Sequence, residues 1–438
     1  MILLALFLSA SLLIHSNVEK AKDQYVHSFP YRFNSPMMYY SKVRLRAVGD
    51  IMFHKGLQKY ALTNPMGFKA LFRNIKTEIL EADISFANLE SPIAKSFKPS
   101  GWPRFNGDPS VLPALKDTGF DILSTANNHT MDKKDKGVTE TIEAIESVGI
   151  VPVGSIRKKD SPLRIIWKKG IKLGFLAFAE HTNKIPVPEG WPKVFILDVR
   201  EDGTAESAIQ LIKASKPSVD VLIVSYHFGG EYLLKPESYK RKVCHQLLEA
   251  GADVLLGHHP HVLQRGEKYV TKDGRECFII YSLGNFVSGQ VQRVLTYDSR
   301  HSKRCHYNDG AILDLQVVKG IGGTAIYKVG FIPTWTQVGR YKALLKTATP
   351  KKRKKFTRIA QALRIKPNRK DFSYHVINIQ KELEGIRKGK SRGLRKLLEY
   401  RLKVIIDRFN PDKSPVVKKV RAIKSRKTRR KKRQRKLG

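Results

Sequence analysis

The sequence predicts an α/β fold in which short strands alternate with helices, and two features of the chain support this prediction. Apolar runs alternate with segments of helical spacing from about residue 43 to residue 332. Polar residues of types that are uncommon in a buried core stand directly after several of these runs. Such an alternation is typical of a sheet that is at least partly parallel and covered by helices.

The elements follow one another in a regular order. A strand is expected where an apolar run is closed by a turn or by polar residues, as at Gly49-Asp50 and Asn127-Asn128. The expected strands are residues 43–48, 84–87, 121–125, 151–153, 165–167, 172–178, 219–226, 254–256, 278–281, 311–318 and 324–332. Apolar residues at helical spacing predict helices over residues 68–81, 109–118, 137–147, 205–214 and 237–250. Because only Lys169-Gly170 and its neighbours separate the strands 165–167 and 172–178, these two should form a hairpin.

The composition describes a folded body with a basic end. The chain has 438 residues, of which 41% are apolar, and this excludes a protein that is disordered throughout or spans a membrane many times. Its formal net charge is +42, and residues 340–438 carry +31 of it, which leaves +11 for the first 339 residues. Such an uneven distribution predicts an anionic partner for the basic end.

The N-terminus is apolar over residues 1–14. This length is short of the roughly 20 residues that span a bilayer, but it fits the apolar part of an export signal. No Lys or Arg precedes Lys20, so an export signal would be atypical or would begin upstream. We expect an exported or membrane-associated protein at the cell surface; a buried N-terminal helix in a cytoplasmic protein is the alternative. Residues 15–41 are expected to form a linker, so that 1–42 precedes the folded body.

The polar residues at the strand ends form a candidate site. In an open α/β sheet, ligands bind outside the carboxyl ends of the strands, where loops from neighbouring strands meet. The residues in such positions are Asp50, Asn88, Glu90, Asn128, His129, His227, His259 and His261. A set of oxygen and nitrogen ligands without a thiolate suits one or two divalent ions, with Mn, Fe or Zn the most plausible. A carboxylate can bridge two such ions, which is a common arrangement for phosphoryl transfer.

Each of these signals has a simpler explanation when it is taken alone. Gly-Asp after a strand is commonly a turn, and Asn-Asn-His can cap a helix. His258 is expected to be a polar loop residue rather than a ligand. The repetition at successive strand ends favours a shared site, because solvated loops have no reason to repeat it.

The motifs together resemble one family, the capsule-synthesis or poly-γ-glutamate (CapA-type) proteins of the calcineurin-like metallophosphatase superfamily. The matching stretches are AVGDIM at 47–52, ADISFANLE at 82–90, GFDILSTANNHTMD at 119–132, VSYHFGGEY at 224–232, GADVLLGHHPHVLQ at 251–264 and YSLGNF at 281–286. They cover roughly residues 43–335. The resemblance implies a β-sandwich flanked by helices, with a metal site at the strand ends.

The resemblance also implies roles for individual residues. The implied metal ligands are Asp50, Glu90, Asn128, His227, His259 and His261, with Glu90 in the bridging position. His129 would act as a general acid facing the substrate. Residues that could orient the ligands or contact the substrate are Asn88, Glu231, Asn285 and His54. Superfamily phosphatases often have Asp-x-His at the first motif, whereas Asp50 is followed here by Ile51 and Met52.

The function implied is the hydrolysis of a phosphoester by metal-activated water during cell-surface polymer production. The substrate would be a phosphoester or an anionic polymer. The alternative is a non-catalytic scaffold on the same fold that binds a surface polymer or another polyanion.

The basic extension, expected over residues 340–438, has two parts. Apolar spacing over 382–409 is compatible with one or two amphipathic helices. Lys418–Gly438 contains 13 Lys or Arg and no acidic residue, so this stretch should be extended and solvated. It suits an anionic membrane surface or an acidic polymer. Nucleic acid is disfavoured, because this stretch has no aromatic residue to stack on bases. A solvated tail with no partner is the remaining alternative.

Overall fold

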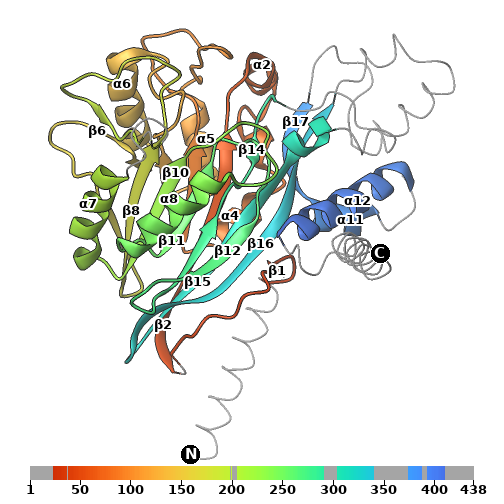
Figure 1. The fold of residues 1–438 in the computed structure, drawn as a ribbon. Coiled ribbons are helices and arrows are strands. Elements are labelled where there is room, and N and C mark those ends of the chain that lie inside the picture. Colours follow the sequence, from red (N-terminus) through yellow and green to blue (C-terminus); the bar gives the residue numbers. More distant parts are fainter. Residues whose placement is uncertain are drawn as a thin grey trace, which may run out of the picture.

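A computed structural model describes residues 23–36, 38–197, 199, 205–290, 303–339, 373–386 and 392–409. Two large β-sheets pack face to face, and helices cover their outer faces (Figure 1). Apolar side chains from both sheets fill the space between them, for example Leu45 and Phe86 from the first sheet and Phe175 and Ile223 from the second. The structure thus confirms the predicted α/β sandwich flanked by helices.

The first sheet has nine strands, in the order β1-β16-β15-β2-β3-β4-β5, with β14 paired to β2 and β17 paired to β16. The strands are β1 (His27–Ser28), β2 (Tyr39–Ile51), β3 (Ile84–Leu89), β4 (Ile122–Ser124), β5 (Val151–Val153), β14 (Asn285–Val287), β15 (Asp309–Gly320), β16 (Gly323–Gly339) and β17 (Ser373–Asn378). Strands β2 to β5 run parallel, so their carboxyl ends meet at one edge of the sheet.

The second sheet has six strands, in the order β12-β13-β11-β10-β8-β7. The strands are β7 (Arg164–Lys168), β8 (Ile171–Ala179), β10 (Val221–His227), β11 (Val254–His258), β12 (Gly266–Val270) and β13 (Glu276–Ile280). Its four central strands are parallel, and β7 and β8 form the predicted hairpin. A small third sheet pairs β6 (Ser155–Ile156) with β9 (Lys193–Val194).

The helices are amphipathic and bury one face each. Those of the first sheet include α2 (Lys55–Thr63), α3 (Lys69–Phe72), α4 (Lys76–Leu80), α5 (Val111–Thr118) and α6 (Lys134–Ser147). Those of the second sheet are α7 (Glu206–Ser215), followed by the 3-10 turn η1 (Lys216–Ser218), and α8 (Ser238–Glu249). Leu71 and Leu115 pack on the outer face of the first sheet, and Leu247 packs on that of the second.

Several boundaries differ from the sequence prediction. The helix expected over 68–81 is divided into α3 and α4, because Ile75 leaves the helical conformation (φ −127°, ψ 4°). The expected linker 15–41 includes β1, which pairs with β16, and the first residues of β2. These pairings join segments about 300 residues apart, so the local sequence carries no signal for them.

The C-terminal region is the largest difference. Strand β17 extends the first sheet beyond β16, and helices α11 (Ile379–Ile386) and α12 (Arg392–Phe409) follow it. The side chains of Leu398 and Phe409 lie in the core cluster between the sheets. Arg401 is buried and forms a salt bridge with Asp309 at the start of β15. The folded body therefore continues to Phe409 rather than ending near residue 335.

The two remaining terminal predictions lie outside the described residues, namely the apolar segment 1–14 and the basic segment Lys418–Gly438. Within the described ranges, no helix combines the length and the apolar character needed to cross a membrane.

The burial of α12 predicts its contribution to stability. Leu398 is fully buried, so Leu398→Ala should lower the free energy of unfolding by about 2–5 kcal/mol. The matched control is Glu399→Ala on the exposed side of the same helix, where Glu399 forms a salt bridge with Arg395 four residues away. This change should cost no more than about 0.5 kcal/mol. Urea unfolding of the three proteins measures both values. Equal stabilities for the two variants would contradict the packing of α12 on the body.

Candidate metal centre

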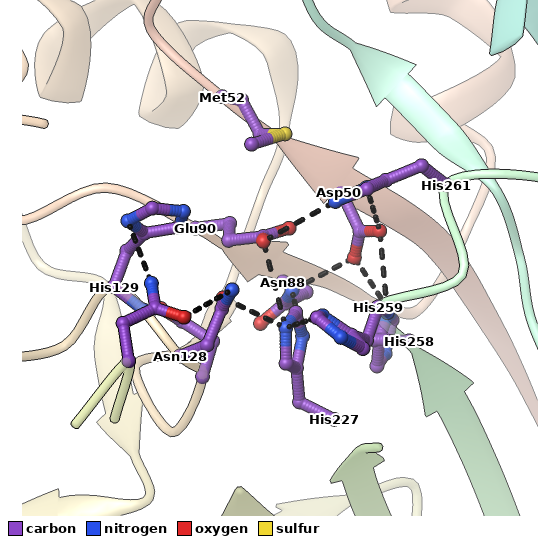
Figure 2. Close-up of polar contacts among 12 residues, drawn as sticks. Asp50, Met52, Asn88, Glu90, Asn128, His129, His227, His258, His259 and His261 are labelled. Atoms are coloured by element: carbon purple, nitrogen blue, oxygen red, sulfur yellow. Dashed lines mark hydrogen bonds and ion pairs between the residues drawn. The ribbon is translucent and has the colours of Figure 1, made fainter. Parts of the chain in front are cut away.

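The predicted ligands converge at one place, where the carboxyl ends of strands from both sheets meet (Figure 2). Asp50 and Asn88 face each other across the β2–β3 register, and Glu90 directly follows β3. His227 is the last residue of β10 and is paired in register with His258 of β11. The loops after β4 and β11 add the remaining candidates, which are Asn128, His259 and His261.

Glu90 lies at the centre of this group. Its side chain is fully buried, and neither carboxylate oxygen has a hydrogen-bond partner among the described residues. Its Oε1 lies 3.5 Å from Nε2 of His227 and 3.6 Å from Nε2 of His261. Burial raises the pKa of Glu90 well above its usual range, and the nearby charges of Asp50 and Glu231 raise it further. A carboxylate buried in this environment takes up a proton unless a positive charge beside it keeps it ionised, and a bound metal ion would supply that charge.

One group of donor atoms lies on the Asn128 side of Glu90. Nε2 of His227 is 3.0 Å from Oδ1 of Asn128 and 3.0 Å from Nδ1 of His259. Burial lowers the pKa of both histidines well below the usual value, and each is lowered further by a neighbouring histidine. Their rings are therefore neutral near pH 7, which is the form that binds metal ions.

A second group lies on the Asp50 side. Oδ2 of Asp50 is 3.0 Å from Nδ1 of His261, and its Oδ1 accepts a hydrogen bond of 2.8 Å from the side-chain amide of Asn88. Burial alone would raise the pKa of Asp50, but hydrogen bonds from His258 and His261 outweigh it and hold the pKa well below its usual range. Asp50 is thus ionised, and its carboxylate could serve as an oxygen ligand for a metal ion.

These two groups fit a pair of divalent ions. In an octahedral site, donors about 2.1 Å from one ion lie roughly 3 Å apart. The two separations of 3.0 Å, from Nε2 of His227 to Asn128 and to His259, match this value. The ligand atoms of Glu90, His227 and His259 lie within 4.8 Å of one another, as do those of Asp50, Glu90 and His261. Glu90 belongs to both sets, which is the place of a bridging ligand.

The backbone holds this geometry at some conformational cost. His259 and His261 have positive φ angles of 92° and 55°, a region that non-glycine residues rarely adopt. A Cβ atom on Gly49 would overlap the carbonyl oxygen of Gly284, which accepts a hydrogen bond of 2.9 Å from the Asp50 N–H. Such local strain is found at functional sites, where the surrounding structure over-determines it.

His129 lies beside the metal residues and faces a cavity of about 320 Å³. Its Nδ1 is 2.8 Å from Oδ2 of Asp132, a carboxylate that also accepts a hydrogen bond from the backbone N–H of Phe105. This contact holds the imidazole ring, so the other ring nitrogen remains for a ligand in the cavity. Asn128 lines the same cavity, which places His129 next to the candidate metal ligands.

The other predicted residues take different positions. The side-chain amide of Asn285 donates to the carbonyl oxygens of His261 (3.4 Å) and Tyr307 (3.1 Å), and so supports the histidine loop. Glu231 lines the cavity. His54 caps the start of α2, its Nδ1 accepts a hydrogen bond from the Gly289 N–H, and burial lowers its pKa to about 4. His54 belongs to none of the candidate metal groups found among the described residues.

His258 was expected to be a loop residue, and that prediction is wrong. Strand β11 continues through it, and its ring is fully buried with Nδ1 3.3 Å from Oδ1 of Asp50. Apolar residues end at Leu256, so hydrophobicity alone gives no sign that the strand is two residues longer.

The fold and this site together define an α/β sandwich protein with a candidate two-metal centre at its strand ends. Residues 44–290 match the family described as bacterial capsule synthesis protein PGA_cap, and the chain belongs to that family. The predicted family resemblance is thereby confirmed. The match ends well before the C-terminal segment that packs on the body.

Individual relatives agree with this assignment. The chain is 30% identical over 251 residues to the PGA biosynthesis protein CapA of Bacillus subtilis, covering 56% of this chain and 62% of that protein. It is 28% identical over 258 residues to the capsule biosynthesis protein CapA of Bacillus anthracis, covering 57% and 60%. The matched region thus spans less than two thirds of each relative. The crystal structure of the calcineurin-like phosphoesterase YfkN from Bacillus subtilis aligns with a TM-score of 0.38 at 14% identity, over 67% of this chain and 91% of that one.

The geometry predicts the effect of removing a ligand. His227→Ala should lose at least one equivalent of bound Mn²⁺, because Nε2 of His227 lies at the centre of the Asn128–His259 group. Metal at 100 times its dissociation constant should stabilise the wild-type protein by about 2.7 kcal/mol, and the variant should lose most of this gain. Metal analysis after dialysis and thermal unfolding with and without Mn²⁺ measure the two effects.

The matched control is His245→Ala. This imidazole lies on α8 and binds Glu267, away from the site, so its removal should leave the metal content unchanged. Wild-type metal content and affinity in His227→Ala would contradict the assignment.

Proposed function

We propose that this protein is a metal-dependent phosphoesterase that acts in the production of an anionic cell-surface polymer. The observation that carries the proposal is the buried Glu90 carboxylate, which has no hydrogen-bond partner among the described residues and lies between two groups of metal-type donors. Two of these donor residues, Asn128 and His261, line a cavity that His129 also lines. This arrangement suits the hydrolysis of a phosphoester, because the developing negative charge needs positive charge and a proton donor at one place.

The protein residues would divide the work as follows. Glu90, Asn128, His227 and His259 would hold one ion, and Asp50, Glu90 and His261 the other. When bound, the ions would supply positive charge that lowers the pKa of water and offsets the charge on the phosphoryl oxygens. Asn88 contacts both Asp50 (2.8 Å) and Nδ1 of His227 (3.2 Å), so it would fix the orientation of one residue from each group.

His129 would supply the proton to the leaving oxygen. Its Nδ1 contacts Asp132, so the ring is oriented with Nε2 as the remaining site for a proton. The edge of the Phe105 ring packs against the imidazole at a centroid distance of 4.6 Å and restricts its rotation. A positioned general acid of this kind contributes about 10²- to 10⁴-fold to a rate.

The link to a surface polymer comes from the relatives, whose names refer to capsule and PGA biosynthesis. A net charge of +42 suits a protein that works on, or next to, a polyanion. The substrate would therefore be a phosphoester in an anionic polymer or one of its precursors, at the cell surface. The basic segment Lys418–Gly438 would hold the enzyme close to an anionic membrane or to the polymer.

A non-catalytic scaffold is the second candidate function. The residues that line the cavity distinguish it from an enzyme. A scaffold needs no proton donor beside the metal centre, whereas His129 lines the cavity and is fixed by Asp132.

The test is turnover of a generic phosphodiester and a generic phosphomonoester by the Mn²⁺-loaded protein. His129→Ala should lower kcat by about 10²- to 10⁴-fold and leave the metal content unchanged. His245→Ala should keep wild-type kcat. A wild-type protein that carries two equivalents of metal and hydrolyses neither substrate above the rate of free Mn²⁺ would favour the scaffold.

A further inference from the structure

The two groups of donor atoms are not equivalent. The Asn128 side has Glu90, Asn128, His227 and His259, whereas the Asp50 side has Asp50, Glu90 and His261, with Glu90 common to both. Asp50 is followed two residues later by Met52. Met52 is buried and lines the cavity, and its sulfur accepts a weak hydrogen bond from Ser288 at 3.7 Å. A thioether is a soft ligand that suits Mn, Fe or Zn poorly, so this side has one donor fewer.

A carboxylate from another loop is in place to supply the missing donor. A ligand atom of Glu231 lies within 4.8 Å of those of His259 and His261, and these three residues form the third candidate metal group among the described residues. Glu90 approaches the histidines from the buried interior. Glu231 is exposed and lines the cavity, so it approaches from the open side.

The loop that carries Glu231 is fixed to the histidine loop. The Tyr232 N–H donates to the carbonyl oxygen of Pro260 (2.8 Å), the residue between His259 and His261. This bond couples the neighbour of Glu231 directly to the two histidines. Tyr232 has a positive φ of 63°, and His259 and His261 also have positive φ angles. The hydrogen bond therefore joins two loops whose backbones are both strained.

Two further carboxylates accept hydrogen bonds from the residues that directly precede Glu231 in the same loop. Glu180 accepts a hydrogen bond from the Gly229 N–H (2.8 Å), and Glu237 accepts one from the Gly230 N–H (2.9 Å). Gly229 has a φ of 92°, and a Cβ there would lie 2.6 Å from Cδ of the buried Lys240. The position of Glu231 is therefore set by hydrogen bonds on both sides of it, which is the support that a ligand needs.

We propose that Glu231 is a metal ligand of the Asp50 side and takes the coordination position that Met52 leaves without a donor. This inference rests on the metal centre of the proposed function, but it concerns only the binding of the ions. It makes the second ion dependent on a loop of the second sheet, and it places a carboxylate between that ion and the cavity.

Mn²⁺ titration of the full chain by calorimetry, after metal removal by a chelator, tests this inference independently of turnover. The wild-type protein should bind two equivalents. Glu231→Gln should bind one equivalent with wild-type affinity and the other at least about 10-fold more weakly. The matched control is Glu143→Gln, an exposed carboxylate on α6, which should titrate as the wild type does.

A compensating variant sharpens the test. Met52→His in the Glu231→Gln background should restore the second equivalent, because it replaces the thioether beside the cavity with an imidazole, which is a good ligand for these ions. Two equivalents with wild-type affinity in Glu231→Gln would contradict the inference, and so would the loss of both. Absence of phosphoesterase activity with this metal pattern intact would overturn the proposed function and leave Glu231 as a ligand.

Discussion

The buried carboxylate of Glu90 is the constraint on which the rest of the site depends. Its two oxygens are out of contact with solvent and have no hydrogen-bond partner among the described residues. Burying an ionised carboxylate in that way costs several kcal/mol unless a cation is present. The neighbouring imidazoles of His227 and His259 do not supply that charge, because burial keeps them neutral. A divalent ion on each side of Glu90 would remove this cost, so the site and its ions would stabilise each other.

The two sheets bring this arrangement about. Parallel strands in each sheet end at the same edge, and the register places Asp50 beside Asn88 and His227 beside His258. Asn88 then links the sheets, because its amide contacts Asp50 of the first and His227 of the second. The apolar core between the sheets fixes their spacing, and thereby how closely the site residues of one sheet approach those of the other.

The sequence alone predicts a large part of this result, and for physical reasons. Asp50 and His227 are recognisable because a buried parallel strand is almost wholly apolar, so a polar residue at its end stands out. The prediction for His258 was wrong because the apolar run ends at Leu256, two residues before the strand does, and its partner Asp50 lies about 200 residues away. The family resemblance singled out Glu231 only as a residue that could orient ligands or contact the substrate, because its place beside the histidines depends on a hydrogen bond between two loops.

The C-terminal segment shows the same limit on a larger scale. The high positive charge of residues 340–438 predicted a single basic extension. Strand β17 nevertheless pairs with β16, and α12 contributes side chains to the core of the body. The salt bridge between Arg401 and Asp309 joins residues 92 apart, and neither position differs in sequence from a solvated charge. Pairings over such distances are determined by the assembled sheet, so local periodicity does not reveal them.

Anomalous diffraction at the manganese edge, from crystals grown with Mn²⁺, tests the central claim most directly. We expect two peaks about 3.5–4 Å apart, with the Glu90 carboxylate in contact with both. The absence of a peak at Glu90, or a peak whose ligands do not include it, would contradict the account.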